Sequence, residues 1–439
     1  MIAMRSAWLL VLGLFTGPVL AMAPIQHWVD PSGARVYFVP APELPMLDLR
    51  IVFAGGSVYD GEHPGLSALT AGMLDEGTQS LTADEFHAAL EATGANYSAG
   101  AGLEMAFLSL RTLSDPPTRD AALTLLQGLL KAPRFEQQAF DRQQAQLLTG
   151  LKQETESPGT LADQLFMKTL YPAHPYGVPS EGTVAGVSGL KLATVAAFYE
   201  RFYVARNAIV LIVGDVSRPD AERLAAQLAQ QLKPGEPAPP VPPVVPVAAR
   251  EVHLEFDSEQ THIAIGQIGI PRGDPDHFPL MLGNHVLGGN GVVARLFEQV
   301  REKRGLSYGV ESHFEPLAQA GPWVASLQTR GEQRAEALDV LKSEIARFVT
   351  EGPTPAELEE ARRNLLGGFP LRIDNNSKIL ENLSMMAFYQ LPLDYLDTWR
   401  EKLGAVTLEE VNAAIRRKLK PAEMSVVTLG RSGANPSSP

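Results

Sequence analysis

Residues 65–78 read GLSALTAGMLDEGT. This stretch predicts a short helix near Gly65–Leu74. Before and after this helix, the first half of the chain predicts strands and longer helices. The predicted strands are Arg35–Pro40, Leu47–Ala54, Ala95–Ala99, Met105–Thr112 and Ala208–Val213. The other predicted helices are Ala83–Ala92, Arg119–Lys131, Phe135–Glu154, Leu192–Tyr203 and Pro219–Leu232.

A proline-rich segment, residues 234–249, separates this half from a second one of similar length. It reads PGEPAPPVPPVVPVAA, and its seven prolines exclude a helix or a central strand, so we expect a semi-rigid extended spacer. The second half predicts strands at Val252–Phe256, His262–Ile268, Ser307–His313, Trp323–Thr329 and Met424–Leu429. Its predicted helices are Phe278–Leu287, Val292–Arg304, Gln333–Thr350, Pro355–Leu366 and Leu408–Leu419, and Asn375-Asn376 could cap another. Because the order of elements repeats once, we expect two homologous α+β sandwich domains.

Composition and charge limit the classes of function. The 439 residues carry a net charge of −13, with a pI near 5.3 and no basic stripe, which argues against nucleic acid as a partner. The first residues resemble a secretory signal peptide, with Arg5 before a short apolar run and small residues at a cleavage pattern. An uncleaved anchor is the alternative. We therefore expect a periplasmic protein with no stable membrane span once the signal is removed.

The predicted division of the chain follows from these features. Residues 1–23 are the signal peptide, 24–233 the first domain, 234–249 the linker, 250–432 the second domain and 433–439 a disordered tail.

The frame of residues 65–78 resembles the zinc helix of the insulinase/pitrilysin/mitochondrial-processing-peptidase family, G-x-x-H-x-x-E-H-M-L-x-x-G-T. The glycine, Met-Leu and Gly-Thr positions of that frame are kept. Ala68 and Gly72 stand where the two His ligands belong, and Ala71 stands where the Glu general base belongs. Alanine and glycine have no side-chain lone pair, and catalytic zinc needs three protein ligands and a water. The resemblance implies a degenerate zinc motif.

The family's remaining zinc ligand is a Glu about 76 residues further along the chain. The matching window, Leu147–Leu151, holds no carboxylate. Glu154 and Glu156 follow it, and both are expected to be solvated surface residues. No metal is therefore expected in this chain.

A second segment, Arg295–Tyr308, closely resembles the R-L-F-x-x-V-R-E-x-x-G-L-x-Y segment in the second half of the same family. Family members use its Arg and Tyr, here Arg301 and Tyr308, to hold the substrate backbone beside the zinc. A guanidinium can donate to a peptide carbonyl, and a Tyr hydroxyl can stabilise an oxyanion. The alternative is that Arg301 is an ordinary surface residue of an amphipathic helix and Tyr308 a core residue at a strand end.

The segment LGGNG, residues 287–291, lies just before that helix. The noncatalytic subunit of the mitochondrial processing peptidase has a Gly-rich loop in this region, so Gly288, Gly289 and Gly291 are candidate substrate-binding positions. A tight helix–helix turn is an equally good interpretation.

Together these resemblances imply two domains, each with a mainly antiparallel sheet covered by helices on one side. They imply a noncatalytic, substrate-positioning subunit of a periplasmic heterodimeric zinc metallopeptidase that cleaves peptides in an enclosed chamber. The partner would be a homologous, zinc-bearing peptidase subunit. Two alternatives stay open: a non-enzymatic peptide-binding or assembly protein of the same fold, and an active zinc metalloendopeptidase with relocated ligands.

Overall fold

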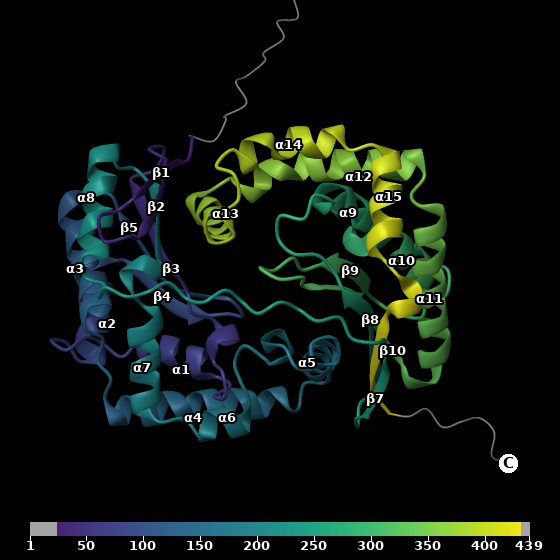
Figure 1. Cartoon of the computed structure of the whole chain (residues 1–439), viewed down its shortest axis with the longest axis horizontal. Coiled ribbons are helices and arrows are strands. Elements are labelled where there is room, and N and C mark those ends of the chain that lie inside the picture. The colour runs from purple at the N-terminus through teal and green to yellow at the C-terminus, as the bar shows by residue number, and fades with distance from the viewer. Residues whose placement is uncertain (1–23, 432–439) are drawn as a thin grey trace, which may run out of the picture.

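The structure is a computed structural model that describes residues 24–431. The predicted signal peptide and the predicted tail, 433–439, lie outside the described residues. The described chain forms two halves, each built on one sheet (Figure 1).

The first half contains a six-stranded sheet with the order β1-β2-β6-β3-β5-β4. Its strands are β1 Gln26–Val29, β2 Arg35–Pro40, β3 Met46–Ala54, β4 Asn96–Ala101, β5 Met105–Leu113 and β6 Ala208–Gly214. The β2–β6 pair is parallel and the other pairs are antiparallel. The helices are α1 Leu66–Met73, α2 Ala83–Thr93, α3 Pro116–Lys131, α4 Gln137–Glu154, α5 Pro158–Leu170, α6 Val184–Ser188, α7 Leu192–Phe202 and α8 Arg218–Ala229. Short turns of 3₁₀-helix are η1 Ser57–Tyr59, η2 Pro175–Gly177 and η3 Ala205–Asn207.

The second half contains a five-stranded sheet with the order β7-β11-β8-β10-β9. Its strands are β7 Glu251–Glu255, β8 Gln260–Ile268, β9 Val310–Phe314, β10 Pro322–Arg330 and β11 Ser425–Gly430. Here the β7–β11 pair is parallel, so the expectation of two mainly antiparallel sheets in an α+β fold is confirmed. The helices are α9 His277–Asn284, α10 Arg295–Phe297, α11 Arg334–Glu351, α12 Pro355–Gly368, α13 Asn376–Phe388, α14 Tyr395–Ala405 and α15 Leu408–Lys418. Short turns are η4 His285–Gly289, η5 Gly291–Val293, η6 Glu298–Glu302, η7 Gly331–Gln333, η8 Phe369–Arg372 and η9 Pro421–Glu423.

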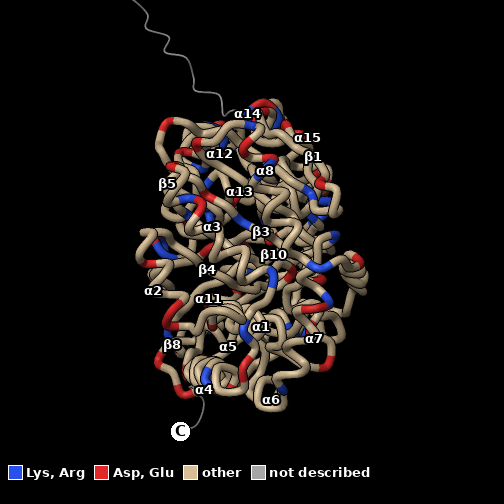
Figure 2. Tube along the Cα trace, turned by 90° about the vertical axis from the view of Figure 1, so that its left-hand side faces the viewer, with Lys and Arg blue, Asp and Glu red and all other residues tan. Residues whose placement is uncertain are grey.

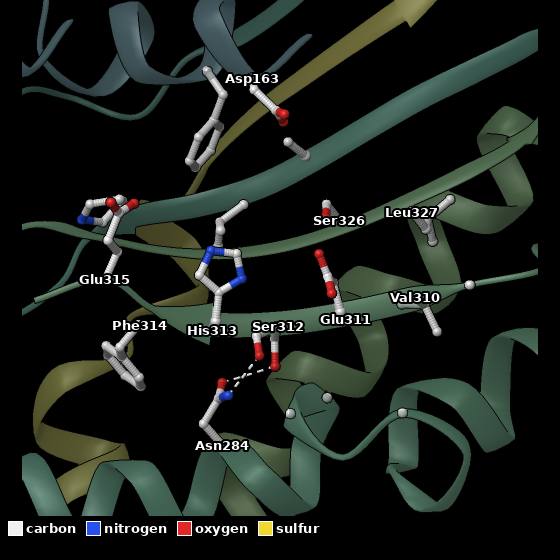
Figure 3. A pocket seen from close by; sticks show the side chains of 18 of the residues that line it. Asp163, Asn284, Val310, Glu311, Ser312, His313, Phe314, Glu315, Ser326 and Leu327 are labelled. Atoms are coloured by element: carbon white, nitrogen blue, oxygen red, sulfur yellow. Dashed lines mark hydrogen bonds between the residues drawn. The ribbon is translucent and has the colours of Figure 1, made fainter. Parts of the chain in front are cut away.

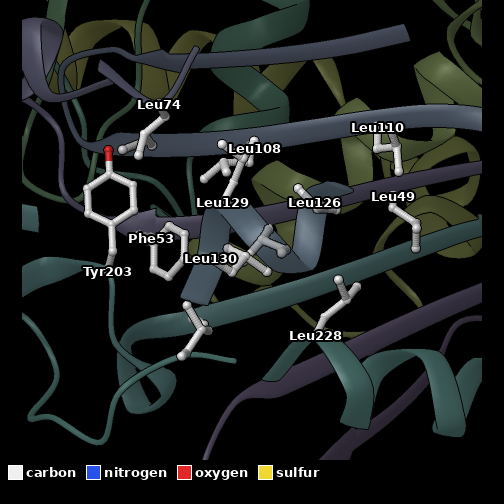
Figure 4. Packing of buried hydrophobic residues seen from close by; sticks show 14 of the residues in the cluster. Leu49, Phe53, Leu74, Leu108, Leu110, Leu126, Leu129, Leu130, Tyr203 and Leu228 are labelled. Carbon is white, nitrogen blue, oxygen red and sulfur yellow. The ribbon is translucent and has the colours of Figure 1, made fainter. Parts of the chain in front are cut away.

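The core of the first half lies between its sheet and α3. Figure 4 shows Leu49 and Leu110 from the sheet near Leu126 and Leu129 from α3, and all four are at most 2% exposed. Complete burial of a leucine side chain contributes about 1.5–3 kcal/mol, so this layer is a main source of stability.

Each half also sends a helix across to the sheet of the other half. From the second half, α13 packs Leu380 and Leu383 against Ile209 of the first sheet. From the first half, α5 packs Phe166 against Val427 of the second sheet. Beyond the helices expected on one side of each sheet, the exchanged helices therefore also bury part of the second side. This exchange explains why β6 is buried along its whole length.

The proline-rich segment is extended, as expected, but it is fixed to the surface of both halves (Figure 1). Arg201 donates hydrogen bonds to the carbonyls of Glu236 and Pro237, at 2.9 and 3.1 Å. Gln319 donates to the carbonyl of Val241 at 3.2 Å, and the Val241 side chain is 8% exposed. These bonds fix the segment to both halves, so the expected semi-rigid spacer is held against the surface of each.

Two predicted elements near the Gly-rich segment differ from the structure. The predicted helix Val292–Arg304 is broken, because Ala294 has an extended backbone (φ −79, ψ 150) and η6 continues as a π-helical turn. The predicted strand Ser307–His313 begins later, at Val310, since the Ser307 hydroxyl bonds both the carbonyl and the N–H of Gly309 and forms a turn. Tyr308 therefore lies in a turn.

Charges of both signs are dispersed over the face that Figure 2 presents. Within residues 24–431, no helix combines the length and the apolar composition needed to cross a bilayer.

Candidate functional site

The degenerate motif forms α1, whose N-terminus is held by the carboxylate of Asp60. Asp60 accepts from the backbone N–H groups of Gly65 and Ser67, each at 2.8 Å. Gly65 adopts a left-handed conformation (φ +96), where a Cβ would also meet Val187 at 2.5 Å. Burial raises the pKa of Asp60 to about 6. The local frame that the family resemblance predicts is therefore maintained by specific packing.

The three working positions on α1 are not arranged for a metal. Ala71 is 3% exposed, and Ala68 and Gly72 are half-buried. A Cβ added at Gly72 would lie 3.0 Å from Oε1 of Gln143 on α4. Gln143 in turn donates to Glu76 at 2.6 Å. The space beside Gly72 is thus occupied by a hydrogen-bonded glutamine, and none of the three positions has a donor atom for zinc.

Residues 147–151, the window for the family's third zinc ligand, lie on α4 and are equally unsuited to bind zinc. Leu147 and Leu148 pack against the first core, and Leu151 is buried. Glu154 accepts from Gln164 at 3.0 Å, whereas Glu156 is exposed. Within residues 24–431, no cluster of three His, Cys, Asp or Glu side chains is placed to hold a metal ion. The residues present do not fit the family's zinc site.

A cavity of about 1400 Å³, here called the chamber, is lined by residues of the second half and of α5 from the first half. The edge strand β9 runs along it, and Figure 3 shows Glu311 and His313 projecting into it. Asp163, from α5 of the first half, faces them across the space. Burial raises the pKa of Asp163, while burial lowers the pKa of His262, which lines the same chamber. The chamber therefore contains titratable groups from both halves.

A hydrogen-bonded asparagine fixes the position of β9. Asn284, the last residue of α9, donates to the carbonyl of Ser312 at 2.7 Å and accepts from its hydroxyl at 2.9 Å (Figure 3). Its Oδ1 also accepts from Nε1 of Trp323 at 2.9 Å. The amide thus covers part of the free edge of β9, which limits pairing with another strand there.

Of the three candidate glycines, two are explained by packing. A Cβ at Gly288 would approach the Ser312 hydroxyl to 2.5 Å, and a Cβ at Gly289 would come within 3.0 Å of Asn284. Gly291 has φ +50 and open space around its Cβ position. All three line the chamber, and only Gly291 lacks a close neighbour.

Arg301 and Tyr308 form a stacked pair at the chamber. The Arg301 guanidinium carbon lies 4.2 Å from the Tyr308 ring centroid and 4.8 Å from that of Phe297. Its Nη1 donates to the Tyr308 carbonyl at 2.9 Å. Tyr308 is 83% exposed, so the alternative that it is a core residue is wrong. Its substrate-binding role stays a prediction.

The residues that line the chamber include Tyr308 but none of α1, so the degenerate motif lies outside the chamber. The sequence interpretation missed Asn284, Asp163, Glu311 and His313. The alternation of Glu311 and His313 could have placed them on one face of a strand. Their approach to Asp163 depends on the exchange of α5, which no local pattern indicates.

Comparison with known proteins supports the resemblance. Residues 39–184 match the family described as Insulinase (Peptidase family M16), and residues 189–365 match the Peptidase M16 inactive domain. The crystal structure of a peptidase M16 inactive domain from Pseudomonas fluorescens is 38% identical, with a TM-score of 0.90 over 94% of this chain and 100% of that one. The crystal structure of a protease from Helicobacter pylori, 18% identical, shares the fold with a TM-score of 0.83 over 92% of this chain and 99% of that one.

Curated relatives are similar over nearly the whole length. The non-peptidase homolog YmxG of Helicobacter pylori is 27% identical, over 93% of this chain and 94% of its own. An uncharacterized zinc protease of Streptomyces coelicolor is 25% identical, over 89% of this chain and 86% of its own.

Proposed function

Because this chain belongs to the insulinase (M16) peptidase family without that family's metal ligands, we propose that it is the noncatalytic, substrate-positioning subunit of a periplasmic heterodimeric zinc metallopeptidase. The observation that carries the proposal is the contrast between two segments. The zinc helix keeps its frame but carries Ala68, Ala71 and Gly72 at the working positions. The Arg301–Tyr308 pair is retained, and its Tyr308 is exposed at the chamber.

The pair would act on a peptide held between this chain and its partner. The Tyr308 hydroxyl accepts no hydrogen bond and makes none within residues 24–431, so it is available to a peptide carbonyl or to an oxyanion. Arg301 keeps further N–H donors beyond the one bound to the Tyr308 carbonyl. Stacking of the two side chains orders the tyrosine before a peptide arrives.

The partner would be a homologous chain with an intact motif. It would supply two His ligands, a Glu ligand and the Glu general base that activates water. Since Tyr308 lines the chamber and α1 of this chain does not, a site completed by a second chain is the simpler arrangement. The cleavage of peptides in an enclosed space between the two chains belongs to this proposal, as does the periplasmic location.

A second candidate is a non-enzymatic peptide-binding or assembly protein. It is favoured by the similarity to a relative that is named a non-peptidase homolog and by a chamber formed within this chain alone. An active enzyme with relocated ligands is disfavoured, because the described residues contain no group of three suitable side chains.

The test is co-purification of the full chain from periplasm, with zinc measured and peptide hydrolysis assayed before and after separation. We expect the separated chain to be inert and a zinc-bearing partner of similar size to restore cleavage. Recovery of the intact chain without any peptidase would instead support the binding or assembly protein. Hydrolysis by the separated chain, with one equivalent of zinc, would contradict both.

A further inference from the structure

Two arginines line the chamber without a carboxylate partner. Arg272 follows β8, and Arg372 ends η8. Within residues 24–431, neither guanidinium makes an ion pair or a hydrogen bond, and the buried Nε of Arg272 has no partner. A buried donor without a partner costs stability, and such groups in folded proteins usually have a ligand or a functional reason.

Both guanidinium groups rest on aromatic rings that are themselves held in place. The guanidinium carbon of Arg272 lies 5.1 Å from the Tyr389 ring centroid, and that of Arg372 lies 5.6 Å from the Trp399 ring. The Tyr389 hydroxyl donates to the buried Glu104 at 2.6 Å. Since the ring contacts one face of each guanidinium, the N–H donors at its edge stay available to a ligand.

The positive charges of Arg272 and Arg372 act electrostatically on the same residue. Both arginines influence the hydroxyl of Tyr395, which lies 3.3 Å from Nε2 of His277. Burial, together with Arg272, lowers the pKa of His277 to about 4, so this histidine is neutral near pH 7 and the charge comes from the arginines. Arg272 and Arg372 thus make this wall of the chamber positively charged, and their N–H donors do not pair with each other.

Nearby carboxylates do not neutralise this wall by direct pairing. Asp274 pairs with Lys418 at 2.6 Å. Glu315 lines the chamber and interacts with Arg272 through space, but the two do not come within ion-pair distance. Asp163 from α5 and Glu311 from β9 add acidic groups to the same chamber. A bound peptide therefore meets charges of both signs.

We propose that Arg272 and Arg372 form a subsite for a carboxylate of a peptide bound in the chamber. The inference rests on the proposed function and adds the chemistry that the peptide must offer. A planar carboxylate matches the edge of a guanidinium with two parallel hydrogen bonds. The carboxylate is either the C-terminus of the peptide or an Asp or Glu side chain. A chamber of about 1400 Å³ is far larger than a small ion needs, so a peptide is the ligand that fits its size.

The test measures binding of three decapeptides, which differ only in their carboxylate groups, to the full chain by competition. The first has a free C-terminus, the second is its C-terminal amide, and the third is the amide with one central Glu. The chain variants are Arg272→Gln, Arg372→Gln, their Lys counterparts and the control Arg416→Gln. Arg416 is exposed on α15, makes no side-chain hydrogen bond and does not line the chamber. Glu315→Gln removes a carboxylate that acts on Arg272 through space.

We expect a carboxylate to improve Kd about tenfold or more, and the gain to vanish in both Gln variants but not in Arg416→Gln. Lys at either position should keep part of the gain, and Glu315→Gln should increase it. If only the peptide with a free C-terminus binds more tightly, the subsite takes a C-terminal carboxylate. If only the Glu peptide binds more tightly, the subsite takes a side-chain carboxylate. Near-UV circular dichroism checks that the variants fold.

Equal binding of all three peptides, or a gain that survives both Gln variants, would overturn this inference and leave the proposed function standing. If no peptide binds to the intact chain, the peptide-positioning function fails as well.

Discussion

The Arg301 guanidinium stacks on the ring of Tyr308 and donates to the carbonyl of the same residue, so a single side chain fixes both the ring and the backbone of the tyrosine. The hydroxyl is thereby presented to solvent at the chamber without a partner. This geometry suits a donor that acts on a bound peptide and not on the protein itself.

Replacement of Tyr308 with Phe should therefore lower turnover of the complex while assembly is unchanged. Loss of one preorganised oxyanion donor typically lowers kcat about 10²–10³-fold. The matched control is Arg304→Gln in the same segment, since Arg304 bonds only Gln299 and does not line the chamber. Steady-state kinetics and analytical ultracentrifugation of the complex are the measurements. Unchanged kcat in Tyr308→Phe would remove the assigned role.

The Asn284 amide should be a main determinant of stability in the second half. Asn284→Ala removes three hydrogen bonds and leaves the buried N–H of Trp323 unpaired. We expect a loss of about 2–4 kcal/mol in the free energy of unfolding, measured by urea titration. Asn364→Ala, which removes one hydrogen bond to His285 at the surface, should cost less than about 1 kcal/mol. Equal losses in the two variants would show that the network is not cooperative.

Two tyrosines near α1 allow the cost of an unpaired hydroxyl to be measured. The Tyr203 hydroxyl is buried without a partner, in the layer that Figure 4 shows beside Phe53 and Leu74. The Tyr97 hydroxyl donates to the Leu74 carbonyl at 3.1 Å. Tyr203→Phe should be neutral or stabilising by up to about 1 kcal/mol, whereas Tyr97→Phe should be destabilising by about 1 kcal/mol. A loss of stability in Tyr203→Phe would indicate a partner for that hydroxyl.

The Asp60 carboxyl gives α1 a pH-dependent stability. Burial raises its pKa from 3.8 to about 6, so between these pH values the folded state binds more protons than the unfolded state. The contribution of Asp60 to the free energy of unfolding is therefore largest below about pH 4. It falls by at most about 3 kcal/mol as the pH rises to about 6.

The measurement compares the native chain with Asp60→Asn across that pH range. Asn has one acceptor oxygen where Asp60 uses two, so the variant should be less stable at pH 4. The difference should then shrink as the pH rises, because only the native chain has a titrating group at residue 60. A difference that does not change with pH would show that Asp60 keeps an ordinary pKa.

Sequence reasoning recovered what local pattern encodes. The frame of residues 65–78 and the segment Arg295–Tyr308 identified the family, and the family match confirms that identification. Asn375 was recognised as a possible helix cap, and its side chain does accept from Lys378 at 3.0 Å. These features depend on residues close in sequence, so one chain suffices to show them.

The features that sequence reasoning missed depend on contacts between the halves. The helix α5 begins at Ser157-Pro158-Gly159, a run that also fits a loop, and its apolar face is explained only by the second sheet. The same holds for α13, which packs on the first sheet. The walls of the chamber come together through this exchange, so Asp163 could not be paired with β9 beforehand.

Restoring the three consensus residues of the zinc helix should not restore zinc binding. Ala68→His, Ala71→Glu and Gly72→His together supply two of the three ligands and the base, but residues 147–151 still lack the carboxylate ligand. The His at position 72 also needs the space of Gln143, whose movement breaks its bond to Glu76. We expect the triple variant to be less stable and to bind zinc well below one equivalent by plasma emission spectrometry.

Addition of Leu148→Glu and Gln143→Ala to the triple variant supplies the ligand and the space, and should raise the zinc content above that of the triple variant. Full zinc occupancy in the triple variant alone would show that α4 does not limit the site.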